Sequence, residues 1–129
     1  MKPASILVID DSPTALELTT YLLNAAGFRT LAAEDGPEGI ELARAERPDL
    51  VLCDIHLPAM DGFEIARAFR ADPALAKIPM IAVTASAMVG DRDKILAAGF
   101  RGYIAKPVTP EMIGEEVSAY LANWADEKE

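Results

Sequence analysis

The chain has 129 residues, of which 51% are hydrophobic, and this combination predicts one folded domain with one core rather than a disordered polypeptide. Asp and Glu outnumber Lys and Arg by 21 to 12, so the net charge of −9 argues against binding to a nucleic-acid backbone. The single cysteine, Cys53, excludes an internal disulfide and agrees with a reducing compartment. No apolar stretch reaches the length of a membrane span and no signal peptide is recognisable, so we expect a cytoplasmic protein without a membrane partner.

Apolar runs alternate with helical patterns five times along the chain, beginning with residues 6–9. This first run predicts a buried strand, and Ser12 followed by Pro13 predicts the N-cap and first turn of a helix that ends at Gly27. The expected core face of that helix consists of Ala15, Leu18, Leu22 and Ala26. The second run, residues 28–33, mixes polar with apolar residues and therefore predicts a strand at a sheet edge.

The middle of the chain continues the alternation. A helix follows Gly36-Pro37 and extends to about Arg47, and the third strand ends at Cys53 or Asp54, where Cys53 is expected to be a small buried residue. A loop over residues 55–62 then leads into a helix that Asp72-Pro73 ends. Its inward side chains are expected to be Ile65 and Phe69.

The last third of the chain predicts two more strand–helix units. A strand over residues 80–84 precedes a helix from about Met88 to Ala98, and a strand over about 101–105 precedes a helix opened by Thr109-Pro110. The apolar stripe of this final helix consists of Ile113, Val117, Tyr120, Leu121 and Trp124. Residues from about 125 to 129 form a charged tail.

The pattern therefore predicts a (βα)₅ α/β domain, a doubly wound parallel sheet with helices on both faces. Four polar residues stand at or next to the carboxyl ends of predicted strands, namely Asp10, Asp54, Thr84 and Lys106. Ligands of open α/β sheets bind outside the carboxyl ends of the strands. These four residues are therefore expected to form one site from distant parts of the sequence.

Four short motifs carry a resemblance to a known family. They are Val8-Ile9-Asp10-Asp11-Ser12, Asp54-Ile55-His56-Leu57-Pro58 with Met60-Asp61-Gly62, Val83-Thr84-Ala85, and Lys106-Pro107. In this order and at these strand ends, they resemble the response-regulator receiver domain of two-component signalling, from end to end of the chain. The resemblance implies a single receiver domain over residues 1–129 and a flavodoxin-like sheet with strand order 2-1-3-4-5.

The resemblance also implies roles for individual residues. Asp54 would accept a phosphoryl group from a histidine kinase or histidine phosphotransfer protein, and Lys106 and Thr84 would bind the phosphoryl oxygens. Mg²⁺ would be held by Asp10, Asp11, Asp54 and the backbone carbonyl of His56. Thr84 and Tyr103 would form a switch that alters the surface of the fourth helix, fifth strand and fifth helix, where a downstream protein binds.

Elementary chemistry supports the same site. A central aspartate can act as a nucleophile and form an aspartyl phosphate. Three carboxylates repel an incoming phosphoryl group unless a cation intervenes, and Mg²⁺ is the hard cation that carboxylates and phosphates share. The Lys106 ammonium and the Thr84 hydroxyl would then neutralise and position phosphoryl oxygens, which is most of what phosphoryl transfer requires.

Other readings of the sequence stay open at this stage. The chain could be a receiver cut from a hybrid histidine kinase, a phosphate-independent docking module, or a small phosphohydrolase that works through an aspartyl phosphate. We expect no enzymatic activity beyond self-catalysed phosphorylation and dephosphorylation. The resemblance also implies that the side chains of His56 and Ser86 border the path of the hydrolytic water. Neither is acidic or amide-bearing, so slow dephosphorylation is expected. The resemblance favours a cis Lys106-Pro107 bond, whereas the general preference of X-Pro bonds favours trans, so the isomer stays open at this stage.

Overall fold

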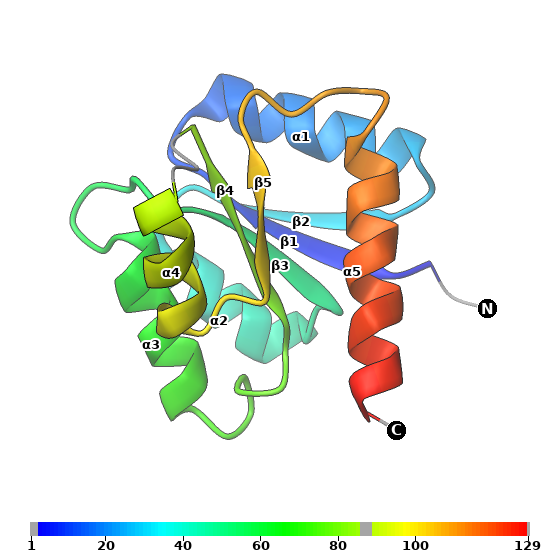
Figure 1. Cartoon of the computed structure of the whole chain (residues 1–129). Coiled ribbons are helices and arrows are strands. Elements are labelled where there is room, and N and C mark those ends of the chain that lie inside the picture. The colour runs from blue at the N-terminus through cyan, green and yellow to red at the C-terminus, as the bar shows by residue number, and fades with distance from the viewer. Residues whose placement is uncertain (1–2, 86–88, 129) are drawn as a thin grey trace.

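The computed structural model describes the backbone of residues 3–85 and 89–128, and the side chains within these ranges except those of residues 89–91 and 124–128. Within these ranges the chain forms five strands and five helices in strict alternation (Figure 1). The strands are β1 (Ser5–Ile9), β2 (Arg29–Ala33), β3 (Leu50–Asp54), β4 (Met80–Thr84) and β5 (Gly102–Ala105). The helices are α1 (Pro13–Ala25), α2 (Gly36–Glu46), α3 (Gly62–Ala71), α4 (Val89–Ala98) and α5 (Ile113–Lys128).

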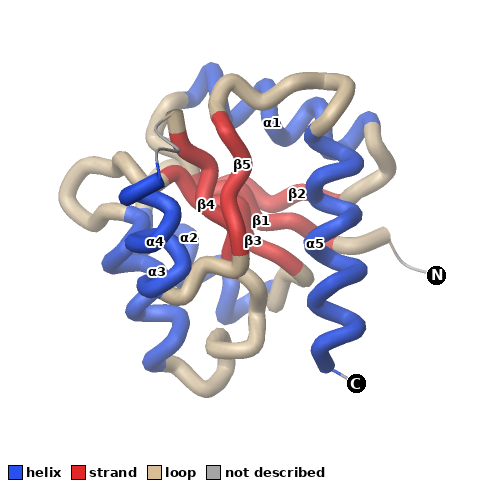
Figure 2. Tube along the Cα trace, viewed as in Figure 1, coloured by secondary structure: helices blue, strands red, loops and turns tan. Residues whose placement is uncertain are grey.

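The five strands form one parallel sheet in the order β2-β1-β3-β4-β5, which confirms the expected topology. Figure 2 shows this sheet as the inner layer, with α1 and α5 on one face and α2, α3 and α4 on the other. β3 lies at the centre of the sheet, whereas β2 and β5 are its edges, so the polar character of β2 is correctly interpreted as an edge signal.

The strand sequences are unbroken apolar runs because helices cover both faces of the sheet, so side chains on both faces are buried. Along β1, Leu7 and Ile9 join a core with α2, α3 and α4, whereas Ile6 and Val8 join a second core with α1 and α5. Every residue of β3 is buried. The carboxyl end of β3 is therefore fixed from both sides, which gives a side chain at that end a defined position.

The core face of α1 differs from the prediction. Leu16, Thr19 and Leu23 are the buried residues, while Leu18 is 47% exposed and Ala26 is also exposed. The helix carries two overlapping stripes with helical spacing, and the observed face is rotated by one residue position, about 100°. Thr19, which no apolar pattern marks, is the polar member of the buried face, and its methyl-bearing side chain lies inward.

Two further boundaries shift slightly. Strand β5 begins at Gly102 rather than at residue 101, and α5 begins at Ile113 rather than at Thr109. The Thr109 carbonyl accepts hydrogen bonds from the N–H groups of Met112 and Ile113, so a turn precedes the helix. The ends of α1, α2 and α3 fall where predicted, with Ser12 and Pro13 at the start of α1 and left-handed Gly27 after its end. Met88, expected to begin α4, lies outside the described residues.

The loop between β3 and α3 folds tightly over the end of the central strand. The Gly62 N–H donates to the Ile55 carbonyl at 2.9 Å, and a Cβ on Gly62 would lie 2.8 Å from the Asp54 carbonyl oxygen, so only glycine fits there. Asp61 and Glu64 form a capping box that fixes the start of α3. The Met60 N–H donates to the Pro58 carbonyl at 2.7 Å across Ala59, whose φ of 66° is left-handed.

Replacing Ala59 with glycine is expected to stabilise the fold. A left-handed conformation costs a non-glycine residue about 1–2 kcal/mol, and the greater chain entropy of glycine offsets part of this, so we expect a net gain of about 0.5–1 kcal/mol in the free energy of unfolding. Urea unfolding measures this gain. The control is Ala122→Gly at an exposed position inside α5, which should lose about 1 kcal/mol. A loss of stability in Ala59→Gly would contradict the expectation.

Candidate functional site

The polar residues predicted to converge do meet at one edge of the sheet. Asp10 directly follows β1, Asp54 ends β3, Thr84 ends β4 and Lys106 directly follows β5. The first three are buried, with exposures of 5%, 6% and 1%. Asp54 pairs with Val83 in the sheet and Thr84 pairs with Ala105, so the ends of β3, β4 and β5 lie side by side.

Lys106 joins two of these carboxylates. Its Nζ lies 2.8 Å from Asp54 Oδ2 and 3.3 Å from Asp10 Oδ2. Burial would lower the pKa of the Lys106 ammonium, but the hydrogen bond and charge of Asp54, and then those of Asp10, outweigh burial and hold this pKa above its usual 10.5. The ammonium is therefore charged at neutral pH, and it compensates two carboxylates that would otherwise be buried without a cation.

Backbone groups orient the same carboxylates. The Ser12 N–H donates to Asp10 Oδ1 at 2.9 Å, and the His56 N–H donates to Asp54 Oδ1 at 3.0 Å. Each carboxylate therefore has one oxygen bound by the backbone of its own loop and the other bound by Lys106. This arrangement fixes where the Asp54 oxygens lie and leaves each of them with further lone pairs for a ligand.

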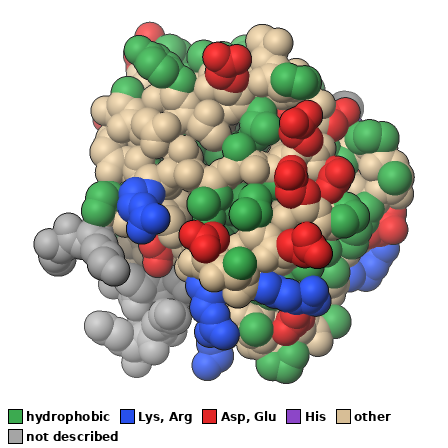
Figure 3. Space-filling view, turned by 180° about the vertical axis from the view of Figure 1, so that it is seen from behind, with side chains coloured by type: hydrophobic (Ala, Val, Ile, Leu, Met, Phe, Trp, Pro, Cys, Tyr) green, Lys and Arg blue, Asp and Glu red, His purple; other side chains and the backbone are tan. Residues whose placement is uncertain are grey.

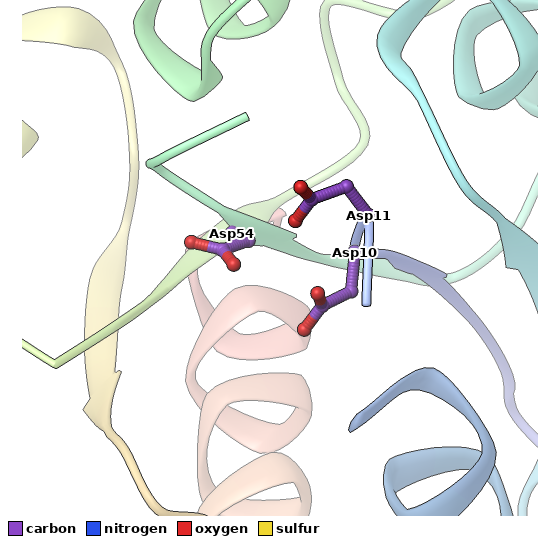
Figure 4. Close-up of side chains that lie close together, drawn as sticks. All are labelled: Asp10, Asp11 and Asp54. Atoms are coloured by element: carbon purple, nitrogen blue, oxygen red, sulfur yellow. The ribbon is translucent and has the colours of Figure 1, made fainter. Parts of the chain in front are cut away.

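Asp11 completes an acidic cluster with these two residues. Oxygen atoms of Asp10, Asp11 and Asp54 lie within 4.8 Å of one another, and Figure 4 shows the side chains of Asp10 and Asp11 pointing toward Asp54. Asp11 is exposed, so the cluster opens to solvent on its side. Carboxylate oxygens at this separation are the donor set that Mg²⁺ prefers, and the residues present fit that ion.

The wider surface is also acidic, in line with the net charge of −9. Figure 3 shows Asp and Glu side chains spread over the face behind the view of Figure 1, with Lys and Arg toward its lower part. An anionic group that approaches this protein meets an unfavourable field. The Lys106 ammonium places a positive charge directly beside Asp54 within these acidic surroundings.

Several other predicted residues lie around the cluster rather than in it. The side chain of His56 is exposed, and its backbone N–H is the group that contacts Asp54. Tyr103 lies half-buried in β5 and packs against the core beneath α4. Cys53 is fully buried, as expected, and burial, followed by the charge of Asp54, raises the pKa of its thiol. Ser86 lies outside the described residues. The Lys106-Pro107 bond, left open above, is cis.

One feature near the site escaped the sequence reading. An apolar hollow of about 280 Å³ shares Asp10 and Lys106 with the site. Its other walls come from α1 and from the segment after β5, namely Ala15, Leu18, Thr19, Ala85, Pro107 and Val108. The exposed Leu18 on α1 was the available signal, and assigning it to the core concealed the hollow.

Comparison with known proteins agrees with this geometry. Residues 6–118 match the sequence pattern of the response regulator receiver domain. The chain belongs to this family. It is a receiver domain of a response regulator of two-component signalling, and the predicted resemblance is confirmed.

The polar-differentiation response regulator DivK of Brucella anthropi is 38% identical over 121 residues, which cover 94% of this chain and 98% of DivK. A putative response regulator from Chloroflexus aurantiacus has a structure with a TM-score of 0.87 and 30% identity, covering 94% of this chain and 99% of that one. The receiver domain of the Pseudomonas aeruginosa sensor histidine kinase PA1611, whose structure holds a magnesium ion in its active-site cleft, is 33% identical with a TM-score of 0.81. That match covers 95% of this chain and 97% of the PA1611 domain. Within the described residues, no helix has the length and apolar character needed to cross a bilayer.

The raised pKa of Lys106 predicts a specific pH dependence of stability. Below its usual 10.5 the ammonium stabilises the fold, and this contribution is lost as pH rises through the higher folded-state pKa. Without divalent cations, Lys106→Met should lower the free energy of unfolding by about 1–3 kcal/mol near neutral pH, because it leaves buried carboxylates unpaired.

The difference between wild type and Lys106→Met should shrink as pH rises above 10.5, since the wild-type ammonium then loses its own charge. Urea unfolding across this pH range measures the difference. Lys77→Met, at an exposed lysine, is the control and should change stability little at any pH. A difference for Lys106→Met that stays constant through strongly alkaline pH would contradict the assignment.

Proposed function

We propose that this receiver domain accepts a phosphoryl group on Asp54, with Mg²⁺, from a histidine kinase or histidine phosphotransfer protein. The observation that carries the proposal is Lys106, whose ammonium bonds Asp54 and Asp10 beside a third carboxylate, Asp11. A nucleophile, a fixed cation and a hard-cation donor set within one cluster are the parts that phosphoryl transfer to a carboxylate needs.

The chemical step follows from this arrangement. An oxygen of Asp54 attacks the phosphorus, the bond between phosphorus and the donor imidazole nitrogen breaks, and that nitrogen keeps the electron pair. Lys106 then bonds a phosphoryl oxygen in place of the unmodified carboxylate, and the Thr84 hydroxyl bonds another. Asp10, Asp11, Asp54 and the His56 carbonyl would hold the Mg²⁺, which supplies positive charge to the phosphoryl oxygens. We propose no activity beyond this self-catalysed transfer and the later hydrolysis, in which water attacks the phosphorus, inorganic phosphate leaves and the Asp54 carboxylate is regenerated.

The apolar hollow beside the site suits the phosphodonor. Leu18 on α1 is exposed and lines the hollow together with Pro107 and Val108, the two residues that follow Lys106 in the chain. Exposed apolar surface next to a reactive group favours a protein partner that buries it. A response regulator and the receiver domain of a sensor histidine kinase both occur among the similar proteins, and the proposed chemistry is the same in either setting.

We further propose that the signal leaves through the α4–β5–α5 surface. Thr84 ends β4, and its strand neighbour in β5 is Ala105, two residues after Tyr103. A hydroxyl drawn toward a phosphate on Asp54 changes the packing beside β5, and Tyr103, half-buried there, can respond. A downstream protein would then bind the altered surface.

The acceptor assignment predicts the outcome of labelling with acetyl phosphate and Mg²⁺. Intact mass should show one added phosphoryl group that hydroxylamine removes, and Asp54→Asn should abolish it. Asp35→Asn is the matched control, because asparagine caps α2 as well as aspartate does. Equal labelling of Asp54→Asn and wild type would move the acceptor to another residue.

The metal assignment predicts that replacing Asp11 stabilises the metal-free protein but reduces the stability that Mg²⁺ adds. In EDTA, Asp11→Asn should raise the free energy of unfolding by about 0.5–1 kcal/mol, because it removes a like charge from the cluster. With Mg²⁺, wild type should gain stability by mass action and Asp11→Asn should gain much less. Thermal unfolding with and without Mg²⁺ tests both effects, and equal Mg²⁺ gains in the two proteins would refute the site.

The proposed switch predicts that removing the Thr84 hydroxyl leaves phosphorylation of Asp54 intact but abolishes the change at the α4–β5–α5 surface. Thr84→Ala should still be phosphorylated on Asp54, but the amide shifts of residues 92–120 should no longer change on phosphorylation. Thr84→Ser keeps the hydroxyl and should retain the changes. Phosphorylation of wild type that perturbs only the loops around Asp54 would show that the switch is wrong.

A further inference from the structure

The edge strand β5 presents backbone groups that no other strand can pair. β5 is the last strand of the sheet, and its inward side is bonded to β4, as the Lys106 N–H to Thr84 carbonyl bond of 2.8 Å illustrates. The N–H and C=O of Tyr103 point the other way, toward the open edge. Unpaired edge groups weaken a strand and invite pairing with other chains.

A side chain from α5 satisfies both of these groups. The Tyr103 N–H donates to Tyr120 Oη at 3.3 Å, and the Tyr120 hydroxyl donates to the Tyr103 carbonyl at 3.1 Å. Burial raises the pKa of the Tyr120 phenol, so the hydroxyl keeps the proton that it donates. One hydroxyl therefore acts as acceptor and donor for a single strand residue 17 positions away.

Gly102 makes room for this contact. A Cβ at Gly102 would collide with the hydroxyl and the ring of Tyr120. The φ of Gly102 is not left-handed, so an alanine would suit the strand backbone itself. What glycine provides at this position is space for the Tyr120 side chain, and the two residues form a matched pair.

Tyr103 is also held from the opposite side. The Arg92 guanidinium of α4 lies 5.5 Å from the centroid of the Tyr103 ring, within the range of a cation–π contact. The ring of Tyr103 thus contacts α4, whereas its backbone contacts α5. This one residue links all three elements of the α4–β5–α5 surface.

We propose that Tyr120 is a positioning residue for signalling: its hydroxyl fastens β5 to α5 at Tyr103, so that α5 responds when β5 changes. The inference rests on the switch proposed above and adds the means by which α5 is included in it. The ring of Tyr103 can leave the Arg92 guanidinium without breaking the backbone bonds to Tyr120. The contact to α5 therefore persists in both states while the contact to α4 changes.

The test compares Tyr120→Phe with Tyr21→Phe, which removes a hydroxyl from a tyrosine on α1 that is 68% exposed. In Tyr120→Phe, hydrogen exchange of the Tyr103 amide should accelerate about fivefold, as expected for the loss of one ordinary hydrogen bond. After labelling with acetyl phosphate and Mg²⁺, the amide shifts of residues 55–62 should change as in wild type. Those of residues 117–123 should change in wild type and Tyr21→Phe but not in Tyr120→Phe.

A second variant tests whether the position of the Tyr120 hydroxyl, rather than its presence, is what matters. Gly102→Ala keeps Tyr120 but displaces its hydroxyl, and it should reproduce both effects of Tyr120→Phe. An unchanged Tyr103 exchange rate in Tyr120→Phe, or α5 shifts equal to those of wild type, would overturn the role of Tyr120 alone. If phosphorylated wild type changes only near Asp54, the proposed switch fails, and the signalling role of Tyr120 fails with it. The unphosphorylated exchange rate still measures the contact in that case.

Discussion

The ion pair between Lys106 and the carboxylates of Asp54 and Asp10 is the interaction on which the site depends. Asp10 and Asp54 have exposures of 5% and 6%, and the ammonium that lies 3.3 Å and 2.8 Å from them offsets the cost of burying two like charges side by side. The rest of the fold places these three groups at the ends of β1, β3 and β5. An ammonium held beside a buried carboxylate at an open sheet edge is an arrangement that can also bind an anionic group.

The sequence allowed the sheet and the cluster to be predicted because both follow from strand ends. Unbroken apolar runs indicate a doubly covered parallel sheet, and the carboxyl ends of such strands share one edge, so the convergence of Asp10, Asp54 and Lys106 could be foreseen. The buried face of α1 could not be foreseen, because Leu16 and Leu18 both belong to stripes with helical spacing. Only the tertiary packing decides which stripe is buried, and the hollow beside Lys106 follows from that decision.

Other features of the α4–β5–α5 surface were also beyond the sequence. Tyr120 was assigned to the apolar stripe of α5, and it does pack against the core beneath that helix. Its hydroxyl bonds depend on the distance between α5 and β5, which no local pattern encodes. Gly102 carried the signal, because a glycine inside a strand marks the close approach of another group.

The spacing of the site along the chain has a consequence for folding. Lys106 bonds a carboxylate 96 residues before it and another 52 residues before it. Contacts of such sequence separation form late, because the loop-closure entropy must be overcome first. The sheet has to be complete from β1 to β5 before Lys106 can bond Asp10 and Asp54. A nascent or partly unfolded chain would therefore present Asp54 without the Lys106 ammonium, and any affinity that depends on this pair would report completed folding.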